Sequence, residues 1–148
     1  IRIPVPPGVT SPNQLRGAVF HEYTHHLVHN LTDGRCPTWL NEGLAQIMEG
    51  ISLNKARSLL SAKKSAQLPS LKDLSGPFSS EKKRSKAERL YAQSLLAVSV
   101  LVDEKGFSTI QPLLANIGQK QSVDEALSGS FGYTCESLDV KLKDALEQ

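Results

Sequence analysis

Apolar residues recur at helical spacing along most of this chain, whereas alternation of apolar and polar residues is confined to residues 1–5. That alternation predicts a single edge strand. Residues 68–78, with two prolines and a glycine, predict a loop. The predicted helices span residues 12–30, 38–50, 52–67, 80–104, 108–117, a short segment that starts at Ser122 and is broken near Gly129 and Gly132, and 135–146.

Two capping boxes support these boundaries. Ser11 can cap a helix, Pro12 suits the first helical position, and Gln14 completes the box. Ser122 and Glu125 repeat the same arrangement later in the chain.

The widest apolar face belongs to residues 80–104, which we expect to form the central core helix. For the helix over 12–30, we expect Leu15, Val19 and Phe20 to supply the apolar contacts. With one short strand at most, the fold class is mostly α.

Length and composition limit the class of protein. A chain of 148 residues that is 39% hydrophobic and 22% charged fits one globular domain, residues 1–148, with a real core. The net charge of +2 gives no indication of binding to polyanions or membranes. The charged run at 81–86 lacks interleaved aromatics, so it favours a solvated helix start over a nucleic-acid contact. No apolar stretch is long enough for membrane insertion. The first residue is Ile1 rather than methionine, which favours a fragment of a longer chain.

An H-E-x-x-H motif at 21–25 is the strongest chemical signal. Two histidines four apart on a helix differ by about 40° in direction and roughly 6 Å along the axis, so His21 and His25 can bind one ion. Glu22 points about 100° away, where it can reach a water on that ion. His29 lies too far from His21 to share the ion, and we expect His26 and His29 to be solvated or packing residues. The competing interpretation is that His21 and His25 are packing histidines.

A hydrolytic zinc site needs three protein ligands and one open position. Six residues after His25, where some zinc enzymes carry a third histidine, this chain has Leu31. Glu42, in the W-L-N-E-G segment at 39–43, is the best remaining candidate; an ordinary first-turn acid favoured by the helix dipole is the alternative. Cys36 as a fourth ligand would close the open position and make the site structural.

The motif at 21–25 and the segment at 39–45 together resemble the gluzincin metallopeptidases, most closely the small peptidase-MA-like or minigluzincin domains related to thermolysin and zinc aminopeptidases. The segment at 90–94 extends the resemblance over most of the chain. It implies an α+β, zincin-like helical catalytic domain whose N-terminal β-sheet is reduced here to a single edge strand or little more. It also implies Zn²⁺ as cofactor and a peptide or protein as substrate.

The resemblance assigns residue roles. It implies His21, His25 and Glu42 as metal ligands and Glu22 as the general base that activates water. It implies that Tyr91 stabilises the oxyanion, although a core tyrosine would look the same.

The role of Tyr91 and the strength of catalysis each have an open alternative. Tyr23 and Tyr133 are rivals for the role of Tyr91. Thermolysin carries an aspartate four residues after its glutamate ligand, which orients a histidine, whereas this chain has Gln46 there. A neutral amide can accept the imidazole proton but does less to raise its basicity.

Cys36 and Cys135 are the only cysteines and could pair. A disulfide would brace the loop before Glu42 and favour an oxidising, extracytoplasmic location, in the cell envelope or secreted. Two cysteines alone do not settle the location.

The sequence thus predicts a zinc-dependent metallopeptidase, of endopeptidase type, without nucleic-acid partners. A latent or degenerate peptidase domain that binds peptide or serves as a zinc-stabilised structural module is the alternative. A non-peptide amide hydrolase would share the metal chemistry. Specificity and oligomeric state are not encoded in any motif of the chain.

Overall fold

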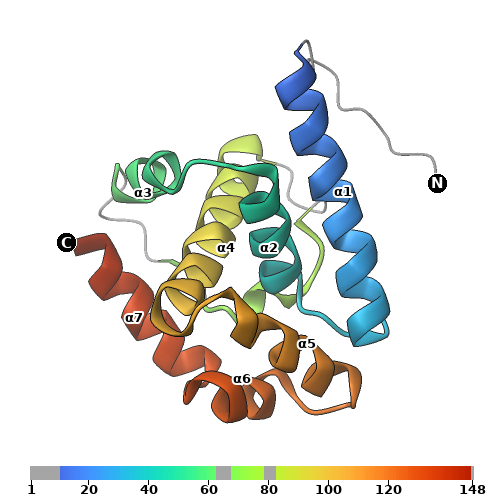
Figure 1. Ribbon diagram of the computed structural model, residues 1–148. Helices are drawn as coiled ribbons and strands as arrows, with labels where there is room; N and C mark the ends of the chain where they lie inside the picture. Colours follow the sequence, from blue (N-terminus) through green and yellow to red (C-terminus); the bar gives the residue numbers. More distant parts are fainter. Residues whose placement is uncertain (1–10, 63–67, 79–82, 148) are drawn as a thin grey trace.

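The computed structural model describes residues 11–62, 68–78 and 83–147, and all regular structure in these ranges is helical (Figure 1). The elements are α1 (Pro12–Thr32), α2 (Thr38–Glu49), α3 (Leu53–Ser61), η1 (Asp73–Ser75), α4 (Arg84–Lys105), η3 (Phe107–Thr109), α5 (Ile110–Gly118), α6 (Val123–Phe131) and α7 (Cys135–Glu147). The mostly α prediction is confirmed. The predicted strand at 1–5 and parts of two predicted helices, at 63–67 and 80–82, lie outside the described residues.

Helix α4 is the central helix, as predicted, and α2, α3 and α7 pack against it (Figure 1). Its middle is buried around most of its circumference, which explains the wide apolar face in the sequence. Each fully buried leucine contributes about 1.5–3 kcal/mol to stability. The buried apolar residues of α4 are Leu90, Ala92, Leu95, Leu96, Ala97, Val98 and Leu101.

Helices α1 and α2 form a helical hairpin that returns the chain alongside itself (Figure 1). Asp33 and Gly34 both have positive φ, 51° and 71°, and reverse the chain direction after α1. The amide of Gly34 donates to the carbonyl of His29 at 3.0 Å, which closes the end of the helix. Pro37 then precedes the first turn of α2. This turn brings the start of α2 back beside the second half of α1.

The buried face of α1 differs from the prediction. Leu15 and Phe20 are exposed and Val19 is half-buried. Small residues let the α2 backbone approach more closely than leucine or phenylalanine would, which explains the difference. The buried residues of α1 are Gly17, Ala18, Thr24, Val28 and Thr32.

Both predicted capping boxes are present, at Ser11 and at Ser122. The predicted break at Gly129 is wrong, because α6 continues through it and ends before Gly132, whose φ of 80° caps the helix. An interior glycine costs a helix about 1 kcal/mol. Burial of Leu127 and Phe131 on either side offsets that cost.

Replacing Ser122 with alanine is expected to lower the free energy of unfolding by about 1 kcal/mol, because the hydroxyl of Ser122 accepts from the Glu125 amide at 3.2 Å. The thermal midpoint should fall by about 2–4 °C. Ser128→Ala, at an exposed position of the same helix, is the matched control. Equal midpoints for the two variants would contradict this account of the cap.

Both cysteines are free thiols in the structure. Cys36 is half-buried in the link between α1 and α2, and Cys135 is buried at the start of α7. Burial raises the pKa of both thiols, that of Cys135 to about 12. The disulfide considered from the sequence is therefore not formed, and the argument that it gave for an oxidising location falls away. Of the helices described, none combines the length and apolar character needed to cross a membrane.

Candidate metal centre

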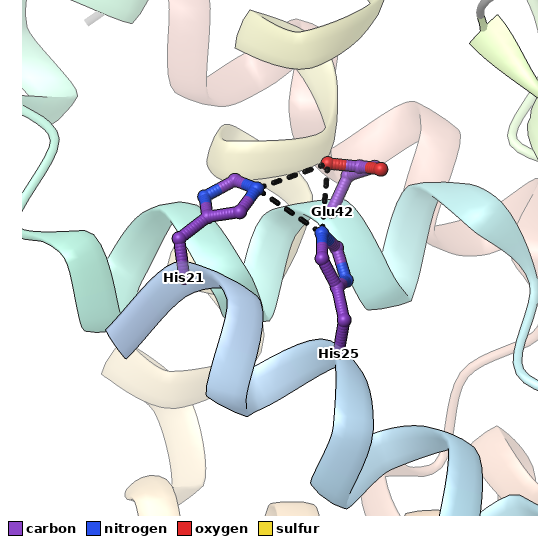
Figure 2. A group of neighbouring side chains, drawn as sticks. All are labelled: His21, His25 and Glu42. Atoms are coloured by element: carbon purple, nitrogen blue, oxygen red, sulfur yellow. Dashed lines mark hydrogen bonds and ion pairs between the residues drawn. The ribbon is translucent and has the colours of Figure 1, made fainter. Parts of the chain in front are cut away.

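Two helices bring three ligand atoms together at the α1–α2 contact. Figure 2 shows His21 and His25 projecting from successive turns of one helix toward Glu42 on the other. The Nε2 atoms of the two histidines are 3.1 Å apart. Oε2 of Glu42 lies 3.8 Å from Nε2 of His21 and 3.7 Å from Nε2 of His25. These three side chains form one group able to hold a metal ion.

The spacing of these atoms fits zinc. A circle through points separated by 3.1, 3.7 and 3.8 Å has a radius of about 2.1 Å, and zinc binds histidine nitrogen and carboxylate oxygen at about 2.0–2.2 Å. An ion near the centre would therefore contact all three atoms without a large movement of any side chain.

The hydrogen bonds of the two rings also favour a cation. Nδ1 of His21 faces Oε2 of Glu49 at 2.8 Å, and Nδ1 of His25 faces Oδ1 of Asn41 at 3.0 Å. Both partners offer acceptor oxygens, so each Nδ1 can donate its proton there and each Nε2 can then offer a lone pair to a metal. Two nitrogen lone pairs and a carboxylate oxygen then converge on the same point. That arrangement suits a cation.

Gln46 does not play the part expected from its position. Its side-chain amide donates to the carbonyl of Glu42 at 3.1 Å and to the carbonyl of Tyr91 at 2.9 Å. Gln46 therefore joins α2 to α4 instead of orienting a histidine. The acid at Nδ1 of His21 is Glu49, which was not predicted from the sequence. Glu49 follows Glu42 by seven residues, or two helical turns, and that spacing was the available signal.

Glu22 is half-buried and is not part of the metal-holding group. Burial raises the pKa of the Glu42 carboxyl, the neighbouring His25 and His21 lower it, and the nearby Glu22 carboxylate raises it. Glu22 on α1 and Glu42 on α2 are thus close enough for their charges to interact.

Tyr91 on α4 lies on the Glu42 side of the site. Its pKa is raised by burial and by the charge of Glu42. The ring of Phe78 packs edge-on against it, with centroids 5.2 Å apart and ring planes at 87°. This contact, and the bond from Gln46 to its carbonyl, hold Tyr91 in place.

The rival residues lie elsewhere. Tyr23 is exposed on α1, and the hydroxyl of Tyr133 donates to Glu104 at 2.5 Å. His26 and His29 are exposed, and Nε2 of His26 faces Asn30 at 3.1 Å. Cys36 is not part of the metal-holding group, so nothing supports it as a fourth ligand.

Comparison with models of protein families gives a match to the Peptidase MA superfamily over residues 8–148. Comparisons with curated proteins and with solved structures give no match. The family match covers nearly the whole chain, including the helices that carry the three candidate ligands and Tyr91, and it confirms the gluzincin-type resemblance. The chain belongs to the Peptidase MA superfamily.

Proposed function

We propose that this chain is a zinc-dependent metallopeptidase that cleaves internal peptide bonds. The observation that carries the proposal is the convergence of two imidazole nitrogens and one carboxylate oxygen on a single point. Membership of a peptidase superfamily supports the same reaction class.

Each residue has a defined task. His21, His25 and Glu42 hold zinc, which when bound acts as a Lewis acid and lowers the pKa of water to about 7. Glu22 accepts the proton of the attacking water and returns it to the amine that leaves. The hydroxyl of Tyr91 donates to the oxyanion that develops on the scissile carbonyl.

A peptide-library digest combined with metal analysis tests this proposal. We expect one zinc per chain, cleavage within the peptides, loss of cleavage after treatment with a chelator, and recovery when zinc is restored. Zinc-loaded protein that leaves the whole library intact would contradict the proposal and favour a latent, peptide-binding or structural module. Cleavage restricted to terminal residues would contradict the endopeptidase assignment.

Replacing Tyr91 with phenylalanine is expected to lower kcat about tenfold to a hundredfold, since a hydrogen bond to a charged group contributes about 1.5–3 kcal/mol. KM should change little, because the bond forms in the transition state. The measurement is steady-state kinetics on a peptide from the digest. Tyr23→Phe and Tyr133→Phe are matched controls expected to retain wild-type kcat. A full-rate Tyr91→Phe enzyme would exclude the assigned role.

A further inference from the structure

Glu49 supplies a carboxylate beside His21, and the H-E-x-x-H motif itself does not predict this carboxylate. It is the last residue of α2, and its Oε2 lies 2.8 Å from Nδ1 of His21. The other ring, His25, has the neutral amide of Asn41 as its partner. The two histidines therefore differ, because within the described residues the Nδ1 of His21 faces a carboxylate and the Nδ1 of His25 faces an amide.

The local backbone leaves space for this carboxylate. Gly17 lies one turn before His21 on α1, and a Cβ built on it would be 3.0 Å from the carbonyl oxygen of Glu49 and 3.3 Å from its Cγ. The missing side chain at position 17 thus allows the end of α2 to lie directly against α1. The Glu49 side chain is 31% exposed, so part of its stem is covered and its freedom is reduced.

Position 46 is committed to another task. The amide of Gln46 donates to two backbone carbonyls, one on each of α2 and α4. Gln46 is buried, with 8% of its surface exposed. A carboxylate could not donate these bonds and would face two carbonyl oxygens without a partner. Glu49, one turn further along α2, is the acid that faces His21 on α1.

We infer that Glu49 is the positioning residue of the zinc site, an inference that rests on the proposed function. By accepting the Nδ1–H of His21, it holds the ring in one tautomer and one orientation, with the Nε2 lone pair directed at the metal. A carboxylate partner also raises the basicity of the ring as a ligand. Glu49 itself touches neither metal nor substrate.

Zinc affinity of the purified chain, measured by competition with a chromophoric chelator, tests this inference without the peptidase reaction. Glu49→Ala is expected to weaken zinc binding about tenfold to a hundredfold. Glu49→Gln keeps an accepting oxygen, so its affinity should lie between those of Glu49→Ala and wild type. Glu136→Ala, which removes an exposed acid from the first turn of α7, should bind zinc as wild type does.

Thermal unfolding of the metal-free variants shows whether they fold. Wild-type zinc affinity in Glu49→Ala would overturn the inference, as would an equal loss in the alanine and glutamine variants. If the expected order of affinities appears but no peptide is cleaved, the peptidase proposal fails and the role of Glu49 stands. If peptides are cleaved and the affinities do not change, the opposite conclusion holds.

Discussion

Replacing Glu22 with glutamine is expected to lower kcat/KM for peptide cleavage by on the order of 10²–10⁴ while zinc stays bound. Glutamine has nearly the same shape but cannot accept the proton of the attacking water. The side chain lies outside the group of three converging ligand atoms, so its replacement leaves those atoms unchanged. The measurement pairs steady-state kinetics with zinc content of the same preparation.

Glu42→Gln is the matched comparison, because it makes the same chemical change at a proposed ligand. It should lose zinc together with activity, since an amide oxygen carries no charge to attract the ion. The two variants thus separate proton transfer from metal binding at neighbouring carboxylates. Undiminished cleavage by Glu22→Gln would refute the assigned base, and loss of its zinc would show that Glu22 belongs to the metal-holding group.

The three ligand candidates could be predicted because their positions depend mainly on local geometry. The spacing of His21 and His25 fixes their common face on any helix. The short turn at 33–37 folds α2 back against α1, and this places Glu42 near that face. The structure brings all three together, with Glu42 oxygen within 3.8 Å of both rings.

Glu49 could not be predicted with the same ease because its contact depends on how α1 and α2 cross. Gly17 permits the close approach of Glu49 to α1, and its missing side chain is a packing feature without a chemical signature. The resemblance to thermolysin also points to position 46, and not to position 49, for the residue that orients a histidine. The hydrogen bonds from Gln46 to two carbonyls show that its side chain links α2 to α4 and does not orient a histidine.

The face of α1 illustrates a second limit. Apolar periodicity marked Leu15 and Phe20 as core, yet both are exposed. The buried residues of α1 include Gly17, Ala18 and Thr24 instead, and Gly17 lies against Glu49 of α2. Close backbone approach, rather than apolar area, decides which face of this helix is buried.

Replacing Gly43 with alanine is expected to lower the free energy of unfolding by more than about 3 kcal/mol, through overpacking at the α2–α4 contact. A Cβ on Gly43 would lie 2.4 Å from the carbonyl oxygen of Ser94 and 2.5 Å from Cγ2 of Val98. The first of these atoms belongs to the backbone of α4 and cannot rotate away. Alanine favours helix over glycine by about 1 kcal/mol, which is too little to offset the clash. Chemical denaturation of the metal-free protein measures the change.

The matched control is Gly129→Ala on α6, where a Cβ would meet nothing within 4 Å. There the helix preference acts without a clash, so stability should rise by up to about 1 kcal/mol. Opposite signs for the same substitution at two helical glycines would isolate packing as the cause, whereas a wild-type unfolding free energy for Gly43→Ala would contradict it. Because Gly43 follows Glu42 directly, any separation of α2 from α4 also moves the ligand carboxylate. Zinc affinity should therefore fall with stability in Gly43→Ala and remain unchanged in Gly129→Ala. The reason is that the backbone at Gly43 positions Glu42.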